Sequence, residues 1–206
     1  MVGAAINNAI SVLDWLKNNI IGEDYLELFK LLDKSEPGAN GLFCMPYLTG
    51  EREPLIGHMT SGTFLGIREY HKRGDIIRSV LEGVAYAISM IKDAFDENNV
   101  RFNEIRIGGA AAKYDSWVQI FANVLDTKVM QSPTDDAALI GSAILGYHIL
   151  GEYPDIVQAS SRMAPNGKFF IPAQELVPKY KKFASFYKDL YWSMEAVFRK
   201  HHDLNE

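Results

Sequence analysis

The chain is poor in cysteine: its 206 residues contain one, Cys44. One cysteine cannot form an intrachain disulfide, so a reducing cytoplasm is the expected compartment. Cys44 lies in the apolar run 42–45, which favours a buried strand residue over a catalytic thiol. The chain also lacks an apolar run of the roughly 20 residues that a membrane-spanning helix needs, and its first residues lack the charged start and apolar block of a signal peptide. We therefore expect a soluble protein with no membrane partner.

Basic residues are not in excess. The formal net charge is −5, whereas a nucleic-acid footprint needs a basic excess or stripe, so no nucleic-acid partner is expected. The five histidines have no metal-ligand spacing with cysteine or acidic residues, which predicts no metal site. Hydrophobic residues make up 48% of the chain and charged residues 23%, as in ordinary globular proteins. No linker divides the sequence, so residues 1–206 are interpreted as one domain.

Hydrophobic periodicity predicts an α/β fold. Apolar residues at helical spacing predict helices over residues 5–19, 23–34, 75–95, 117–125, 136–150 and 177–200. Strand-like segments are 41–48, 63–67, 104–107, 128–131 and 169–171. The region 151–168 is expected to be a loop. Two successive strand-helix pairs after residue 103 predict parallel strands in a mixed sheet flanked by helices.

A strand-turn-helix rich in small residues is the first candidate site. Residues 105–113 read IRIGGAAAK. Such a turn lets the backbone approach a phosphate closely and points free N–H groups of a helix start at an anion. It is neither a Walker A motif nor a dinucleotide-binding fingerprint. Tight packing of a strand on a helix would use the same small residues, so the turn alone leaves both interpretations open.

Two acidic positions have competing interpretations. Asp135 and Asp136 precede a predicted helix, where capping of free N–H groups is favoured over a metal pair. Glu51 and Arg52 are neighbours in a loop, and an ion pair that fixes this loop is favoured over a place beside a ligand cleft.

The most informative segment is Gly62–Glu82, GTFLGIREYHKRGDIIRSVLE. It predicts a short strand, a solvated turn and a long helix entered at Asp75. The segment has small, aromatic, glycine and aliphatic residues in a fixed order, followed after a spacer by Arg78 and residues 79–82. This order resembles the C-terminal signature of the FGGY family of ATP-dependent carbohydrate kinases. The resemblance covers nearly all of the chain and implies an actin-like ATPase (ribonuclease H-like) domain. It implies that the chain is the family's C-terminal, nucleotide-side domain.

The family's N-terminal domain carries an Asp-x-Gly-Thr phosphate loop, the sugar pocket and the catalytic aspartate. That tetrapeptide is not found in this sequence. The resemblance therefore implies no catalytic residue in this chain and no activity of the chain alone.

The resemblance also gives the small-residue turn a role. Lys113, Trp117 and Gln119 match the basic residue, Trp and Gln that follow the family's glycine-rich segment, which contacts nucleotide phosphates. The implied ligands are ATP and Mg²⁺. The implied cofactor-binding residues in this turn are Gly108, Gly109, Ala110 and Lys113.

Two alignments of the turn are open. Anchored on Lys113, the family's glycines fall on Gly109, Ala110 and Ala111. If one alanine is inserted, they fall on Gly108 and Gly109 instead. Each alignment keeps Gly109.

The N-terminal helix departs from the family. Residues 3–10 resemble the family segment Gly-Ala-Ile-Asn-Asn-Gly-Gly, with Ala9 and Ile10 in place of the last glycines. In the family this helix lies against the nucleotide, and Ile10 would occupy space there. Asp14 stands where the family often has a polar group that reaches the nucleotide, and an ordinary surface acid is the alternative.

Two functions remain open. Residues 50–54 resemble the Gly-Glu-Arg-x-Pro segment of the family's xylulose and gluconate kinases, which implies transfer of the ATP γ-phosphate to a sugar or sugar-acid hydroxyl. The alternative is a non-catalytic remnant with an interaction or regulatory role, favoured by Ala9, Ile10 and Ala110. The sugar would bind through the absent domain. The face turned toward that domain should be exposed, so homo-oligomers are expected.

Overall fold

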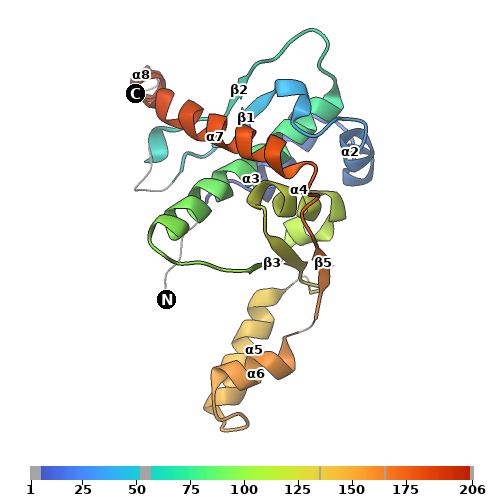
Figure 1. Ribbon diagram of the computed structural model, residues 1–206, viewed down its shortest axis with the longest axis vertical. Coiled ribbons are helices and arrows are strands. Elements are labelled where there is room, and N and C mark those ends of the chain that lie inside the picture. Colours follow the sequence, from blue (N-terminus) through green and yellow to red (C-terminus); the bar gives the residue numbers. More distant parts are fainter. Residues whose placement is uncertain (1–5, 52–56, 135, 165, 205–206) are drawn as a thin grey trace.

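The structure, a computed structural model, describes residues 6–51, 57–134, 136–164 and 166–204. Helices pack with two small sheets (Figure 1). The strands are β1 Phe43–Met45, β2 Thr63–Leu65, β3 Glu104–Ile107, β4 Lys128–Gln131 and β5 Lys168–Phe170. The α-helices are α1 Ile10–Leu16, α2 Tyr25–Leu32, α3 Arg73–Glu97, α4 Asp115–Leu125, α5 Ala137–Ile149, α6 Ile156–Met163, α7 Val177–Ser193 and α8 Glu195–Asp203. Shorter segments are the π-helix η1 Lys17–Ile21 and the 3₁₀ turns η2 Ala39–Gly41, η3 Gly57–Met59 and η4 Ala110–Lys113.

The larger sheet has the strand order β3-β4-β5. Strands β3 and β4 run parallel with Ile107 opposite Gln131, and β5 joins antiparallel with Lys168 opposite Gln131. Strands β1 and β2 form a separate antiparallel pair. The predicted mixed sheet and the predicted parallel pair of strands are therefore confirmed.

Helix α3 forms the centre of the fold, and α2, α4, α7 and β1 pack against it (Figure 1). Its residues Ile77, Leu81 and Val84 are completely buried, together with Trp117 of α4 and Tyr187 of α7. Burial of each such aliphatic side chain contributes about 1.5–3 kcal/mol. Because α4 also packs on β4 and β5, this core connects the β1–β2 pair to the larger sheet.

The start of α3 is fixed by Asp75. Its carboxylate accepts the backbone N–H of Lys72 at 2.8 Å, the Ser35 hydroxyl at 2.5 Å and the Asn40 amide at 2.9 Å. Burial acts to raise the Asp75 pKa, but these hydrogen bonds outweigh burial and hold the pKa below its ordinary value of 3.8. Asp75 therefore caps the helix and ties it to the segment between α2 and β1.

We expect Asp75→Ala to lower the free energy of unfolding by about 2 kcal/mol at pH 7, because it removes a helix cap and two further hydrogen bonds. Since the folded pKa is lowered, this contribution is present above about pH 4 and is lost as the pH falls through the folded value. Urea titrations at pH 7 and pH 3 measure the effect, and the difference from wild type should shrink at pH 3. Asp155→Ala, which removes the one N-cap bond of α6, is the control and should cost less. An equal loss at both pH values would show that the charge of Asp75 is not what stabilises α3.

Further along α3, Glu82 is the centre of a buried polar network. Its side chain accepts the Gly38 backbone N–H at 2.9 Å, the Tyr180 hydroxyl at 2.8 Å and Arg78 at 3.5 Å. Arg78 also donates to the Leu32 carbonyl at 3.2 Å. The network joins α3, α7, the end of α2 and the segment before β1. Arg78 and Glu82, which belong to the segment 62–82, therefore connect these elements of the fold.

Several element boundaries differ from those predicted. The region 151–168, predicted to be a loop, contains α6, which begins where the Asp155 side chain accepts the Gln158 N–H at 2.8 Å. The last helix is interrupted at Met194, between α7 and α8, where no glycine or proline signals a break. The first helix begins at Ile10 and passes into the π-helix η1. The strands predicted over 41–48 and 63–67 contain three residues each, and the strand predicted over 169–171 begins one residue earlier.

Four aromatic residues of α7 and α8 face the core, as their spacing predicts, whereas Phe186 is 46% exposed. The buried ones are Tyr180, Tyr187, Tyr191 and Phe198. They pack toward α3 and β1, where Tyr187 donates to the Tyr47 hydroxyl at 3.0 Å. A base-stacking surface is excluded for these side chains because they are not accessible.

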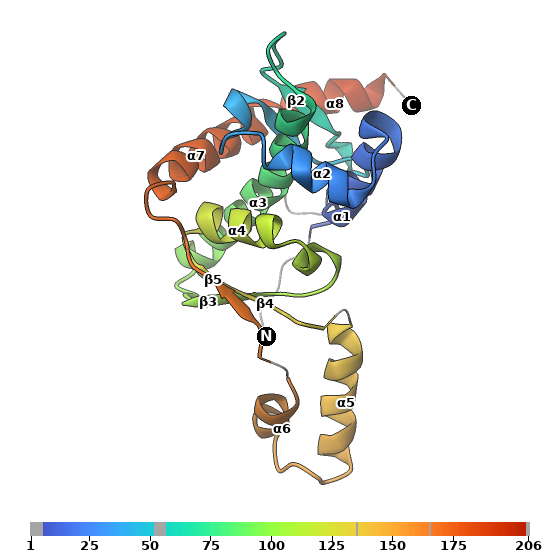
Figure 2. The same cartoon turned by 90° about the vertical axis from the view of Figure 1, so that its right-hand side faces the viewer.

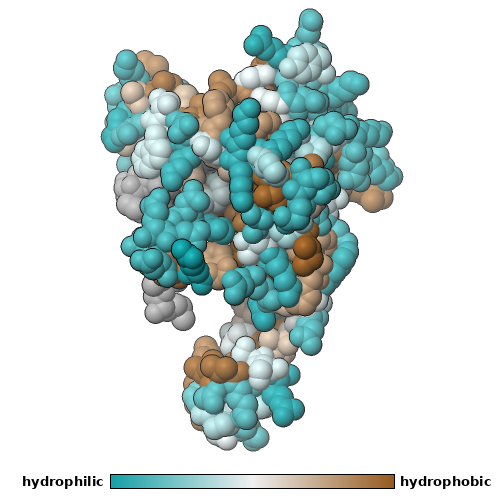
Figure 3. All heavy atoms as spheres, in the orientation of Figure 1, coloured by the Kyte–Doolittle hydropathy of each residue, from teal (hydrophilic) through white to brown (hydrophobic). Residues whose placement is uncertain are grey.

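Helices α5 and α6 form a hairpin that projects from the rest of the molecule (Figures 1 and 2). Hydrophobic atoms gather over it in Figure 3, and the exposed fractions reach 82% at Ile149 and 78% at Val157. In the described part of the chain, β3 has β4 as its one hydrogen-bonded neighbour, so the other edge of β3 is unpaired. The hairpin is therefore exposed apolar surface, and this edge of β3 has no strand partner among the described residues.

Candidate functional site

The turn between β3 and α4 has an open backbone at Gly109. This residue has φ +75° and ψ −158°, a region of backbone space that residues with a side chain rarely occupy. A β-carbon built on Gly109 would meet no atom of the described chain within 4 Å. The turn η4 follows, and α4 begins at Asp115. An open glycine turn at a helix start has room for an anion close to the backbone.

Two loops meet at the carboxyl ends of β3 and β4. The Ser132 N–H donates to the Ile107 carbonyl at 2.8 Å, so the chain leaving β4 stays beside the chain leaving β3. A β-carbon on Gly108 would lie 3.4 Å from the β-carbon of Ala137, at the start of α5. In α/β sheets, ligands bind at the carboxyl ends of the parallel strands. The turn therefore lies where this fold class places its ligands.

The start of α5 is capped by Asp136. Its carboxylate accepts the Leu139 backbone N–H at 3.1 Å. The predicted capping role is confirmed for Asp136, whereas Asp135 lies outside the described residues.

Two tyrosines connect the turn to α1. The Tyr25 hydroxyl donates to the Asp14 carboxylate, and the Tyr25 ring lies 5.4 Å from the Tyr114 ring, centre to centre. Tyr114 directly follows Lys113, and its ring stacks on Phe29 at 4.1 Å. Burial and the negative charge of Asp14 raise the pKa of Tyr114. Asp14 thus lies close to the turn, with its carboxylate engaged by Tyr25.

Tyr25 and Tyr114 are not among the site residues selected from the sequence. The periodicity of residues 23–34 places Tyr25 on an apolar stripe and gives no sign of its bond to Asp14. For Tyr114 a signal exists, because it directly follows the matched Lys113 at the start of a helix.

The six residues selected from the sequence lie on two elements. Ile10 and Asp14 belong to α1, where Ile10 packs against the hydrophobic core. The others belong to the turn, where Lys113 and Ala110 are exposed. The contact between Tyr25 and Tyr114 brings Asp14 toward the turn, while the contacts of Ile10 are in the core.

The loop after β1 is fastened to the segment before α1. Glu51 is 4% exposed and accepts the Asn7 backbone N–H at 3.0 Å. The Gly50 carbonyl accepts the Asn8 side-chain amide at 2.8 Å. These bonds agree with a structural role of Glu51, and Arg52 lies outside the described residues.

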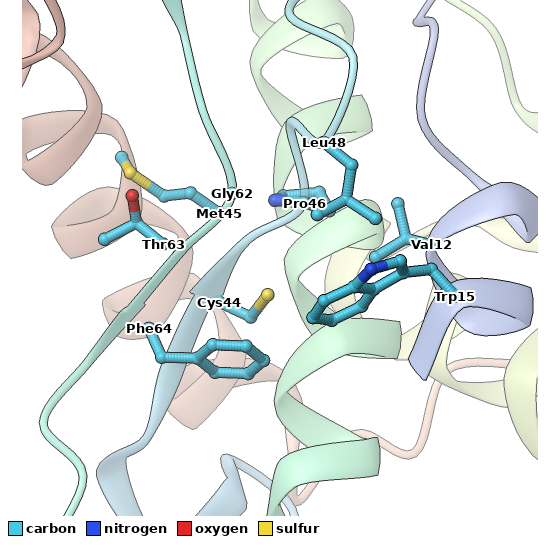
Figure 4. A pocket seen from close by; sticks show the side chains of 9 residues that line it. All are labelled: Val12, Trp15, Cys44, Met45, Pro46, Leu48, Gly62, Thr63 and Phe64. Carbon is cyan, nitrogen blue, oxygen red and sulfur yellow. The ribbon is translucent and has the colours of Figure 1, made fainter. Parts of the chain in front are cut away.

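Two pockets lie near α1 and α4, and the second borders Asp115 at the start of α4. An apolar pocket of about 190 Å³ lies between α1 and the β1–β2 pair, where Trp15, Cys44 and Phe64 point toward one another (Figure 4). Burial raises the pKa of the Cys44 thiol, which agrees with a buried strand residue. A second pocket, of about 360 Å³, is lined by residues that include Arg78 and Lys168. Neither pocket is lined by Gly108 or Gly109, so the turn forms an open wall.

Within the residues that the structure describes, no group of three or more His, Cys, Asp or Glu side chains is placed to hold a metal ion. In the same described ranges, no helix is long and apolar enough to cross a membrane.

Known proteins resemble this chain along most of its length. The model for the C-terminal domain of the FGGY family of carbohydrate kinases matches residues 1–150. The xylulose kinase of Bacillus subtilis (strain 168) is 27% identical over 180 residues, which are 87% of this chain and 36% of that protein. The gluconokinase of Bacillus licheniformis is 28% identical over an alignment of 210 positions, which covers 96% of this chain and 41% of that protein. The crystal structure of ligand-bound xylulose kinase from Lactobacillus acidophilus has a TM-score of 0.85 at 22% identity, over 95% of this chain and 40% of that one.

The fold is that of an actin-like ATPase domain, as predicted, with a mixed sheet and surrounding helices. The chain belongs to the FGGY family of carbohydrate kinases and corresponds to the family's C-terminal domain. It spans between 36% and 41% of the length of these relatives.

Proposed function

We propose that this chain, acting as one domain, is the nucleotide-binding part of an ATP-dependent carbohydrate kinase. Such an enzyme transfers the γ-phosphate of ATP to a hydroxyl of a sugar or sugar acid. The observation that carries the proposal is the open turn at Gly109, at the carboxyl ends of two parallel strands. The names of the relatives, xylulose kinase and gluconokinase, support the substrate class.

The residues of the turn bind the phosphates in this proposal. Gly108, Gly109 and Ala110 present backbone N–H groups, and Lys113 adds a positive charge, which suits phosphate oxygens. The empty space at the β-carbon position of Gly109 fits a group that approaches the backbone. Asp14 forms the neighbouring wall on α1, whereas Ile10 of the same helix packs against the core. Asp14 holds Tyr25 against Tyr114 and thereby fixes one side of the site.

The chemistry is divided between this chain and the domain that the relatives have in addition. ATP and Mg²⁺ supply the phosphoryl group and the charge that stabilises its transfer. This chain orients the phosphates. The sugar and the group that takes its hydroxyl proton are assigned to the other domain, so no catalytic residue is proposed here.

A calorimetric titration of the purified chain with Mg-ADP tests the proposal. We expect saturable binding at one site and no ATP turnover with xylulose or gluconate by the chain alone. Turnover by the pure chain would contradict the division between domains. Absence of ADP binding would favour the non-catalytic remnant, since Ala9 and Ile10 stand where the family has glycines.

Self-association is a further part of the proposal. The exposed hairpin α5–α6 and the unpaired edge of β3 support homo-oligomers, and the buried Cys44 without a disulfide partner supports a cytoplasmic location. Light scattering after size-exclusion chromatography should show a mass that rises with concentration from the 23.1 kDa of one chain. Val157→Glu should reduce this rise, whereas Leu26→Glu, at a leucine of α2 that is 65% exposed, should not. A constant monomer mass would show that the hairpin does not mediate self-association.

A further inference from the structure

Gln131 lies at the junction of the elements that frame the glycine turn. It is the last residue of β4, opposite Ile107 of β3 on one side and Lys168 of β5 on the other. Its side-chain amide donates to the Ala112 carbonyl at 2.7 Å and to the Asp115 carboxylate at 2.8 Å. Both hydrogens of one amide nitrogen are therefore used, one by an acceptor at the end of the turn and one by the first residue of α4.

The turn is held at both ends by consecutive residues of one loop. Before the turn, the Ser132 N–H donates to the Ile107 carbonyl at 2.8 Å. Near the end of the turn, the Gln131 amide holds Ala112. The stretch 108–111 between these anchors contains the open backbone of Gly109. The distance between its two ends is thus set by β4 and the residue that follows it.

The Asp115 carboxylate completes this arrangement. Gln131 engages one of its oxygens and Lys168, the cross-strand neighbour of Gln131, engages the other. The hydrogen bond from Lys168, followed by that from Gln131, holds the Asp115 pKa below its ordinary value, so the group stays charged. The side chains of Lys168 and Asp115 are both more than half exposed, and such ion pairs add little stability. Their effect is to fix the first residue of α4.

We propose that Gln131 is a positioning residue of the nucleotide site, which keeps the glycine turn in its phosphate-binding shape before the ligand arrives. A loop that is already ordered loses less conformational entropy on binding, so its affinity is higher. This inference rests on the proposed function. Gln131 acts through Ala112 and Asp115 and does not itself touch the ligand.

Gln131→Ala should weaken Mg-ADP binding by roughly fivefold, the loss expected for hydrogen bonds that order a loop. The amides of Gly109–Lys113 should exchange with deuterium faster, with little change in the thermal midpoint.

Gln131→Glu should weaken binding further, because a carboxylate at this position faces two acceptors. Combining Gln131→Glu with Asp115→Asn should recover part of the affinity, since an asparagine amide can donate to the new carboxylate. Gln174→Ala is the matched control, because that amide reaches the Pro172 carbonyl in its own loop.

Equal affinity and equal exchange in wild type and Gln131→Ala would overturn the inference. Faster exchange throughout the core with a lower midpoint would also overturn it, because Gln131 would then be an ordinary stabilising residue. If the wild-type chain binds no Mg-ADP, the proposed function fails. Hydrogen–deuterium exchange alone then tests whether Gln131 holds the turn. Faster exchange confined to Gly109–Lys113 would then support its positioning role, and unchanged exchange would overturn it.

Discussion

Replacement of Gly109 by valine is expected to abolish detectable binding of Mg-ADP. The backbone angles of this residue, φ +75° and ψ −158°, are strained for a residue with a β-carbon by about 1–3 kcal/mol. The valine side chain would also extend into space in which the described chain has no atom within 4 Å. That space is where the phosphates are proposed to lie. We expect a loss of about a hundredfold or more, which corresponds to about 2.8 kcal/mol.

The control for backbone strain is Gly151→Val. Gly151 also has a positive φ, +81°, and its β-carbon position is likewise open, but it lies in the connection between α5 and α6. Calorimetric titrations of both variants and wild type separate strain from loss of the site. We expect Gly151→Val to bind as wild type does. If Gly109→Val binds Mg-ADP with unchanged affinity, the phosphates do not lie against this turn.

Replacement of Glu82 by alanine is expected to have the largest effect on stability. Glu82 is 1% exposed, and its loss leaves the buried Arg78 without its carboxylate and the Gly38 N–H and Tyr180 hydroxyl without their acceptor. Removal of one partner of a buried charged pair costs about 3–5 kcal/mol. Urea unfolding at pH 7 measures this loss. Tyr180→Phe, which removes one donor of the network, should cost less, about 1.5–3 kcal/mol.

The pH dependence of the stability of Glu82→Gln is a second test of this network. Burial raises the Glu82 pKa above its ordinary value of 4.5, although the surrounding donors and Arg78 oppose the rise. A raised folded pKa contributes stability below about pH 4.5, and this contribution is lost as the pH rises through the folded value. Glu82→Gln lacks this titration, so the stability of wild type relative to the variant should fall as the pH rises from 4.5. A difference that is constant with pH would show that Glu82 does not titrate in the folded chain.

Locally determined parts of the fold could be predicted from the sequence. Helix α3 begins at Arg73, two residues before the predicted start at Asp75. Its position could be predicted because the capping carboxylate and the apolar stripe lie within a few residues of each other in the sequence. Strands β3 and β4 match the prediction over residues 104–107 and 128–131. The apolar runs of both strands are short and are bounded by turns. Parallel strands need a crossover connection, which the helix between β3 and β4 provides.

Features that depend on distant contacts could not be predicted. The bond from Tyr25 to Asp14 joins residues on two different helices, and the bond from Gln131 to Ala112 crosses from one strand to the turn after another. Periodicity records which side of an element is apolar and carries no information on such pairs. Helix α6 was missed because it is short, Ile156–Met163, and its apolar residues do not share one buried stripe: Val157 is exposed and Ala159 is buried.

The hairpin of α5 and α6 has a mechanical consequence for the turn. The chain enters the hairpin just after Gln131 and returns through Gly167, whose β-carbon position lies 1.8 Å from the Gln131 carbonyl. Both ends of the hairpin are therefore anchored at the residue that holds the glycine turn. A side chain at position 167 would therefore displace the backbone of Gln131, the residue that fixes Ala112 and Asp115.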